Sequence, residues 1–209
     1  MKQLPAIIVL AAGRGSRFGG NVHKLAQPLG AMSLLGRTIS NAIESQLPVV
    51  VVTTDKLAAE AARWVARLDL VLLPEVRSAG SPTLGMGYSI AAGVAARPHA
   101  NGWLVLPGDM PLVRPSTLLA VAKGLAQSPI VYAQYQGRRG HPVGFAAELY
   151  SELVQLKGDE GARRVTARFP SVGLELGDPG VLIDVDTEAD LAAVRKVGAL
   201  AEPSSLRDG

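Results

Sequence analysis

The sequence predicts an α/β fold: a single domain of three layers (α/β/α) built on a mostly parallel, doubly wound sheet. Short apolar runs at residues 6–10, 49–53 and 103–106 have the composition of strands that are buried on both faces. Segments of helical composition separate these runs, and this alternation is typical of parallel sheets with helical crossovers. The 209 residues, 48% of them hydrophobic, suffice for one well-buried domain rather than two.

The first half of the chain alternates regularly between strands and helices. The first apolar run leads directly into a glycine-rich loop, after which we expect a helix at 32–45. The valine-rich run 49–53 is typical of a buried strand, and the alanine-rich segment 56–67 of a helix. A third apolar strand at 70–73 is ended by Pro74. Right-handed crossovers would bring the carboxyl ends of these strands to one edge of the sheet.

The second half continues the same alternation. Helices are expected at about 83–96, at 115–127 and at 147–156, and strands at 103–106, 130–134 and 181–187. Pro115 suits the first turn of its helix, where a missing N–H costs nothing. Thr187, with Asp190 three residues later, is expected to cap a final helix. The domain is expected to span 1–197, and the polar residues 198–209 to form a disordered tail.

The loop after the first strand is rich in glycine and positive charge. Its glycines let the backbone turn N–H groups towards a polyphosphate, and its cations add charge at the same place: Gly13, Gly15, Gly19, Gly20, Arg14, Arg17 and Lys24. A loop at the carboxyl end of a central strand is where an open α/β sheet binds its ligand. We therefore interpret it as a nucleoside-triphosphate site.

Three alternatives compete with that interpretation. A glycine-rich turn after a strand is often only a turn. A Rossmann dinucleotide site should open directly into a helix, whereas Pro28 and Gly30 delay any helix here. A P-loop needs the pattern GxxxxGK[ST], and Lys24 is followed by Leu25 without that glycine spacing. The two motif alternatives fit poorly.

Two further loops follow strand ends. Gly85 and Gly87, near the start of the helix at 83–96, either leave N–H groups open to an anion or a base edge, or let the helix pack closely on the sheet. Asp109 follows the strand at 103–106, directly after Gly108. Its carboxylate is a hard oxygen ligand of the kind that Mg²⁺ prefers, although aspartate is also common in ordinary turns.

Polar groups also gather late in the chain. The segment 137–143 interrupts the alternation with an arginine pair and His141, which is a candidate general base or anion donor. The arginines favour a pocket for an anionic acceptor. In the expected strand 181–187, Asp184 and Asp186 are two residues apart and so lie on one face.

Composition excludes several classes of protein. With 4% aromatic residues, sequence-tolerant stacking on single-stranded nucleic acid is not expected. The 21 Lys and Arg are scattered, so the net charge of +3 suits a small anionic substrate better than a nucleic-acid or membrane surface. The absence of cysteine rules out disulfides, thiolate metal sites and cysteine nucleophiles. The N-terminal apolar run is too short to span a membrane, and a cytoplasmic protein is expected.

In combination, these motifs resemble a known family. The segment LAAGxGSRFG at 10–19, followed by Lys24, resembles the signature loop of nucleotidyltransferases with a MobA-like fold, and GDMPLV at 108–113 resembles their metal-binding strand end. GHPV at 140–143, GDxGAR at 158–163 and DVDT at 184–187 look like the molybdenum-cofactor cytidylyltransferase branch. The resemblance extends from about residue 6 to 195, and implies a Rossmann-like sheet of the nucleotidyltransferase type.

The resemblance implies a reaction in which the terminal phosphate of molybdopterin attacks the α-phosphorus of CTP and expels pyrophosphate. By resemblance Asp109 and Asp186 hold Mg²⁺, and Arg17, Lys24 and Asp109 are the catalytic residues. The implied nucleotide-binding residues are Leu10, Ala11, Ala12, Gly13, Gly15, Ser16, Arg17, Lys24, Gly85 and Gly108. The implied acceptor-binding residues are Arg139, His141, Asp159 and Arg163. A molybdenum hydroxylase is the implied downstream partner.

Substrate choice leaves alternatives open. Ala12 puts a methyl group where a glycine would let the backbone approach a larger purine, which favours CTP over GTP. The stretch from Arg17 to Lys24 is longer than in the compact form of the cofactor branch, by residues around 21–23. Guanylyl, sugar-phosphate and isoprenoid-pathway nucleotidyltransferases are the enzymatic alternatives, and a non-catalytic carrier of nucleotide or cofactor is the other.

Overall fold

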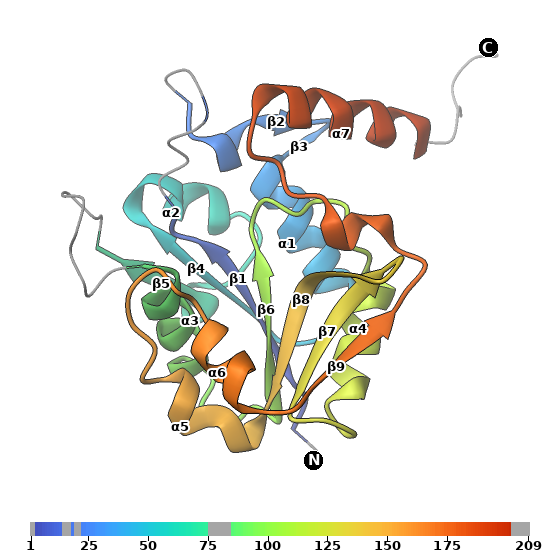
Figure 1. Ribbon diagram of the computed structural model, residues 1–209. Helices are drawn as coiled ribbons and strands as arrows, with labels where there is room; N and C mark the ends of the chain where they lie inside the picture. The colour runs from blue at the N-terminus through green and yellow to red at the C-terminus, as the bar shows by residue number, and fades with distance from the viewer. Residues whose placement is uncertain (1–2, 14–17, 19–21, 75–84, 202–209) are drawn as a thin grey trace, which may run out of the picture.

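The computed structural model (Figure 1) describes residues 3–13, 18, 22–74 and 85–201, the last four by their backbone alone. Within these residues one seven-stranded sheet has the order β5-β4-β1-β6-β8-β7-β9. Its strands are β1 (Ala6–Ala11), β4 (Val49–Thr54), β5 (Leu70–Leu73), β6 (Gly102–Pro107), β7 (Ile130–Tyr135), β8 (Arg138–Ala146) and β9 (Ser171–Glu175). A short separate hairpin is formed by β2 (Pro28–Leu29) and β3 (Met32–Ser33).

The sheet is mostly parallel, as predicted. β1 pairs in parallel with β4 and β6, β4 with β5, and β7 with β9. Only β8 is antiparallel to its neighbours β6 and β7 within the described residues. The loops after β1 and β6 therefore leave the sheet at the same edge, because these two strands are parallel neighbours.

Helices cover both faces of the sheet (Figure 1). They are α1 (Leu34–Glu44), α2 (Asp55–Ala61), α3 (Met86–Ala95), α4 (Pro115–Gly124), α5 (Tyr150–Leu153), α6 (Arg163–Arg168) and α7 (Glu188–Ala201). Alternate side chains of β1 enter different cores: Ile7 packs with α1 and α4, whereas Ile8 packs with α3 and α5. Two buried cores on opposite faces confirm the predicted three-layer fold.

Residues 137–143, expected to interrupt the fold, instead belong largely to β8, the longest strand described. Its apolar part pairs with β6, where Val143 lies opposite Val105 and Phe145 opposite Trp103. Gly140 gives the segment the composition of a loop, but it serves close packing. A Cβ atom on Gly140 would collide with the backbone oxygen of Val181. The expectation was wrong because Gly140 is required by tertiary packing; only Gly137, with φ of +74°, belongs to a local turn.

Gly140→Ala is expected to destabilise the protein by about 1–3 kcal/mol, because the new methyl group would meet rigid backbone. Gly177→Ala is the matched control, since a Cβ atom there has no heavy atom within 4 Å. Urea unfolding of both variants checks the prediction. Equal midpoints for the two variants would contradict it.

The expected strand at 181–187 was also wrong. The chain forms a 3₁₀ helix, η4 (Pro179–Leu182), and then runs past the sheet without joining it. Asp178 starts η4 by accepting a hydrogen bond from the N–H of Gly180, and Pro179 suits the first helical position. The sheet edge is taken by β9 instead. β9 is mostly exposed, so it lacks the apolar run that signals a strand.

The β2–β3 hairpin and α6 were not expected from the sequence, and the other differences concern element ends. α2 is shorter than the expected helix 56–67, and the segment 147–156 divides into a 3₁₀ turn, η3 (Ala147–Leu149), followed by α5. α7 runs to Ala201, beyond the expected start of a tail at residue 198. The stretch Gly198–Ala201 contains two alanines and a leucine, whose helix propensity offsets the cost of the glycine. Residues 202–209 lie outside the described residues. No helix in the described part of the chain has the length and apolarity needed to cross a membrane.

Candidate active site

A cleft of about 910 Å³ lies beyond the carboxyl ends of β1 and β6. It gathers predicted site residues from six parts of the chain: Gly13 after β1, Lys24, Asp109 after β6, Arg139 and His141 on β8, Arg163 at the start of α6, and Asp186 before α7. Arg138 and Asp184 line it as well. Predicted nucleotide, metal and acceptor residues thus share one cleft.

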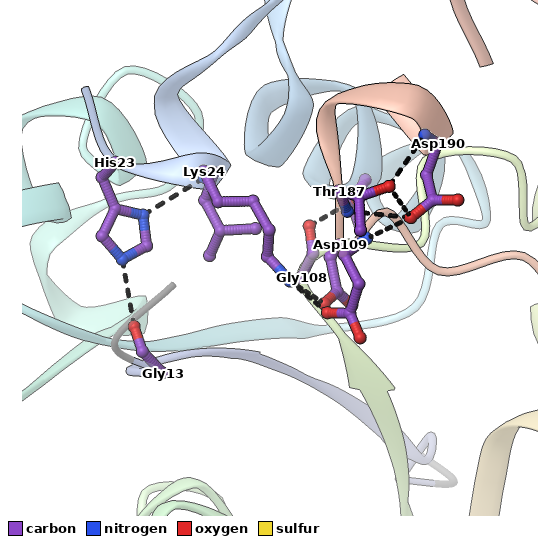
Figure 2. Close-up of polar contacts among 10 residues, drawn as sticks. Gly13, His23, Lys24, Gly108, Asp109, Thr187 and Asp190 are labelled. Atoms are coloured by element: carbon purple, nitrogen blue, oxygen red, sulfur yellow. Dashed lines mark hydrogen bonds and ion pairs between the residues drawn. The ribbon is translucent and has the colours of Figure 1, made fainter. Parts of the chain in front are cut away.

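The centre of the site is a three-way ionic contact (Figure 2). The Nζ atom of Lys24 donates to Oδ2 of Asp109 at 2.7 Å and to Oδ1 of Asp186 at 2.9 Å. The Lys24 side chain is 11% exposed, against 20% for Asp109 and 34% for Asp186. Burial lowers the pKa of Lys24, but hydrogen bonds and Coulomb attraction from the two carboxylates outweigh burial and raise that pKa above its ordinary value. Lys24 is therefore a charged ammonium group at neutral pH.

Asp109 is held by the end of β1 and by the segment that precedes α7. Gly108 N–H donates to the Leu10 carbonyl at 2.8 Å, and the Gly108 carbonyl accepts from the Thr38 hydroxyl. A Cβ atom on Gly108 would lie 2.9 Å from the Leu10 oxygen, so this approach requires glycine. The Asp109 carbonyl accepts from Val185 N–H at 3.0 Å. That last bond brings Asp186 next to Asp109.

Asp186 is held from its other side by the cap of α7, whose Thr187 and Asp190 are labelled in Figure 2. Asp190 Oδ2 accepts from Asp186 N–H at 3.2 Å and from the N–H and the hydroxyl of Thr187 at 2.8 and 2.7 Å. The Asp190 N–H donates back to the Thr187 hydroxyl at 3.2 Å, which confirms the predicted cap. The hydrogen bond from the Thr187 side chain, followed by those from the backbone, lowers the pKa of Asp190. The cap of α7 thereby holds the backbone of Asp186, whose side chain contacts Lys24.

Asp190→Ala is expected to weaken divalent-metal binding about ten-fold, because the backbone of Asp186 loses its brace. Glu188→Ala is the matched control: it removes an exposed carboxylate from the same helical turn without touching the cap. Titration with Mn²⁺ in the presence of CTP measures both affinities. An equal loss in the two variants would mean that only net charge matters, and would contradict the prediction.

The two carboxylates fit a divalent cation. Their oxygens already converge on one ammonium ion, and the second oxygen of Asp109 is buried with no hydrogen-bond partner in the described structure. No group of three or more His, Cys, Asp or Glu side chains suited to a metal occurs among the described residues. Mg²⁺ is commonly bound by one or two carboxylates together with substrate phosphates and water, so two acids suffice. Asp184 is exposed and lies in the cleft lining, outside the contact around Lys24.

His23 is a site residue that the sequence analysis did not identify. Its Nδ1 accepts from Leu25 N–H at 3.2 Å, so in the neutral ring the proton is on Nε2, which donates to the Gly13 carbonyl at 3.0 Å. Burial lowers the pKa of His23, the hydrogen bond to Gly13 opposes that shift, and the charges of Lys24 and Lys56 add to it. The neutral ring is therefore favoured at pH 7. Its only signal in the sequence was the long stretch before Lys24.

The other side of the cleft combines cations with apolar surface. Arg139 lies over the ring of Tyr132, with 4.4 Å from its guanidinium carbon to the ring centre. His141 sits beside it on β8, and burial lowers the pKa of His141; the charges of Asp109 and Asp184 oppose that shift and Arg139 reinforces it. Ile90, Val105 and Phe145 supply apolar wall.

Two of the predicted glycines pack against protein. Gly87 N–H donates to the Gly158 carbonyl at 2.8 Å, so it is not open to a ligand as the first alternative required. A Cβ atom on Gly85 would lie 2.4 Å from the Gly158 carbonyl carbon and 2.5 Å from Oδ1 of Asp159. Close packing is the correct alternative for Gly87, though against the segment 157–159 and not against the sheet. Asp159 itself lies at this contact.

The remaining residues that were predicted to bind nucleotide divide into two groups. Leu10 and Ala11 belong to β1, and Ala12 and Gly13 follow at its carboxyl end, where Leu10 and Gly13 line a small cavity with Lys24 and Asp109. Gly15, Ser16 and Arg17 lie outside the described residues.

Comparison with known proteins places this site in context. The family model described as "MobA-like NTP transferase domain" matches residues 7–172. The purine catabolism protein PucB of Bacillus subtilis (strain 168) is 28% identical over 205 residues, which are 90% of this chain and 95% of PucB. The bifunctional protein GlmU of Alkalilimnicola ehrlichii is 36% identical over 121 residues, or 58% of this chain; the match spans 25% of GlmU.

Solved structures share the whole architecture. The crystal structure of Rv0371c from Mycobacterium tuberculosis H37Rv superposes with a TM-score of 0.78 at 26% identity, covering 94% of this chain and 99% of Rv0371c. A complex of Rv0371c with manganese has a TM-score of 0.75. The similarity to these solved structures thus extends over nearly the whole chain, including both sides of the cleft.

Proposed function

Because the chain belongs to the MobA-like NTP transferase family of nucleotidyltransferases, we propose that it transfers CMP from CTP to a molybdopterin-type phosphate acceptor and releases pyrophosphate. The observation that carries the proposal is the contact of Lys24 with Asp109 and Asp186 inside the cleft. It joins a charged ammonium group to two hard oxygen ligands, the groups that neutralise a reacting triphosphate.

The chemistry requires positioning more than proton transfer. A phosphate monoester is mostly a dianion at pH 7, since its second pKa is about 6. One of its oxygens attacks the α-phosphorus of CTP; the new P–O bond forms as the bond to the β-phosphate oxygen breaks, and pyrophosphate leaves. Lys24 and Arg17 stabilise the negative charge that develops on the leaving group. No side chain has to accept a proton in this step.

Asp109 and Asp186 would hold a divalent cation, for which Mg²⁺ is our proposal. The cation supplies charge neutralisation at the α-phosphate and the pyrophosphate. The manganese complex of the relative Rv0371c supports a divalent metal in this architecture. Lys24 pairs with the same two carboxylates, so a cation bound by Asp109 and Asp186 would release its ammonium group to stabilise charge on the phosphates.

The acceptor side suits a ring system that carries phosphate. Arg139 and Arg163, with Arg138 beside them, provide cations for the anionic group, and His141 provides a polar edge. The apolar wall supplies contact area for a flat heterocycle. Asp159 contacts the start of α3, and we assign it a supporting role at this wall. The proposed product would pass to a molybdenum hydroxylase in the cytoplasm.

CTP is the proposed donor because of Ala12 at the end of β1. The methyl group of Ala12 leaves less room for a purine base. One methyl group discriminates between two substrates by about 1–3 kcal/mol. A sugar phosphate is the second candidate acceptor, because sugar-phosphate nucleotidyltransferases are among the alternatives that the sequence leaves open. The near-complete match to PucB, a single unit of similar length, favours the first candidate.

The test is pyrophosphate release with Mg²⁺, offering CTP, GTP, ATP and UTP in turn with molybdenum-loaded molybdopterin or with a hexosamine phosphate. CTP-selective turnover with the pterin supports the proposal. GTP-selective turnover would overturn the role given to Ala12, and turnover with the sugar phosphate would replace the acceptor. Nucleotide binding without turnover on any acceptor would favour a carrier.

A further inference from the structure

We propose that His23 is a positioning residue, which holds Lys24 in register with the end of β1 so that the site binds a metal–triphosphate. This inference deepens the proposed function and rests on it only for triphosphate binding, not for the choice of base or acceptor.

His23 makes one hydrogen bond on each side of its ring. Nε2 donates to the carbonyl of Gly13, the first loop residue after β1, and Nδ1 accepts from the backbone of Leu25. Gly13 and His23 are ten residues apart in the chain, so the ring closes a loop between them. Figure 2 shows this ring spanning the gap between Gly13 and the backbone beside Lys24.

The second hydrogen bond starts the element that carries Lys24. η1 (Lys24–Ala26) is a single 3₁₀ turn with His23 as its N-cap, and the ring accepts a hydrogen bond from the N–H of Leu25, its second residue. Leu25 is buried in the core beneath it. The direction of the Lys24 side chain is therefore set by the ring above and the core below.

The long stretch before Lys24 explains why the hydrogen bonds of the His23 ring are needed here. The stretch before Lys24 is longer than the compact form of the motif, and each added residue leaves the lysine less constrained by the strand. The ring restores that constraint. Beneath it, a cavity of about 80 Å³ is shared by Gly13, His23, Lys24 and Asp109. A shift of the His23 ring would therefore displace Lys24 relative to Asp109 and Asp186.

Both hydrogen bonds of the His23 ring can form only while the ring is neutral. A protonated ring carries N–H groups on both nitrogens, so Nδ1 would face the Leu25 N–H as a second donor. Charged groups that face the ring are Lys24 on η1 and Lys56 on α2, and both repel a proton; Asp109 lies across the small cavity. Because burial lowers the pKa of His23, the arrangement is intact at neutral pH and above and is lost as the pH falls through that lowered pKa.

The experiment compares the wild type with His23→Asn, His23→Gln and His23→Ala. Asparagine keeps an oxygen cap for η1 but is too short to bridge to Gly13, whereas glutamine is long enough to donate to that carbonyl. The probe is Mn²⁺·CTP, whose dissociation constant is measured by calorimetry between pH 5 and 8, beside the melting temperature. Inorganic pyrophosphate with Mn²⁺ is the second probe.

We expect His23→Asn and His23→Ala to weaken Mn²⁺·CTP binding about ten-fold at pH 8, the equivalent of one hydrogen bond, with partial recovery in His23→Gln. The wild type should lose affinity towards pH 5 more steeply than these variants, which have no imidazole to protonate at position 23. His141 titrates in all of them and cancels in the comparison.

Two results would overturn the inference: unchanged affinity in His23→Asn and His23→Ala, or a lower melting temperature with the same affinity and pH profile as the wild type. Failure of the proposed function looks different. If the protein binds Mn²⁺·CTP yet transfers nothing to molybdopterin, the comparison of affinities remains decisive for His23. If only pyrophosphate binds, the base choice is wrong and the same variants are scored with that probe.

Discussion

Asp109→Asn is expected to reduce turnover by about 10²–10³-fold or more, while leaving the fold intact. The amide preserves the shape of the side chain but removes the charge that pairs with Lys24 and that a divalent cation requires. The backbone carbonyl of residue 109 still accepts a hydrogen bond from the N–H of Val185, because the substitution does not change the backbone. Steady-state pyrophosphate release measures the effect, and circular dichroism verifies the fold.

Asp186→Asn and Asp184→Asn sharpen this prediction, because the two acids are only two residues apart. Asp186 contacts Lys24 at 2.9 Å, so its amide should behave like that of Asp109. Asp184 is exposed and does not contact Lys24, so its amide should cost less than ten-fold. A larger loss for Asp184→Asn than for Asp186→Asn would mean that the second ligand has been assigned to the wrong acid.

Lys24→Met is expected to have two effects of opposite sign. Turnover should fall by about 10²–10³-fold, because the developing charge on pyrophosphate loses a preorganised cation. Binding of Mn²⁺ without nucleotide should become tighter, because the ammonium group that stands between the two carboxylates is gone. Methionine keeps an unbranched side chain of comparable reach, so the surrounding packing changes little.

Single-turnover assays and Mn²⁺ titration by electron paramagnetic resonance measure the two effects separately. Lys123→Met is the control: it removes the same charge from the exposed end of α4, and should change neither quantity. Weaker Mn²⁺ binding in Lys24→Met would show that the lysine orients the carboxylates for the metal and does not compete with it.

Local patterns in the sequence determined the frame of this protein. The apolar runs of β1, β4 and β6 are continuous because parallel strands are covered on both faces, so each was visible from its own residues. The glycine loop and Asp109 were visible for a related reason. They directly follow such strands, and the ends of parallel strands share one edge of a sheet. The cap formed by Thr187 and Asp190 is likewise a pattern within four residues.

Only the tertiary structure decided the elements whose partners are distant. β8 was missed because its glycines suggest a loop. In the structure, these glycines allow η4 and α4 to pack closely against the strand. The segment 181–187 was mistaken for a strand because Val181 and Val185 are buried without joining the sheet. In both cases, the amino-acid composition indicated that the segment is buried, but it did not indicate which secondary-structure element covers it.

The same division applies to the site. Lys24 and Asp109 were recognised separately, but their contact joins residues 85 apart, and the contact with Asp186 joins residues 162 apart. His23 had no motif at all, because its role arises from where β1 ends relative to η1. The sequence determined which charges the site would contain. The parallel pairing of β1 with β6, and the contact of the segment before α7 with Asp109, decided which of these charges meet. Only the tertiary structure could decide this, because distances between remote residues depend on chain topology and not on local pattern.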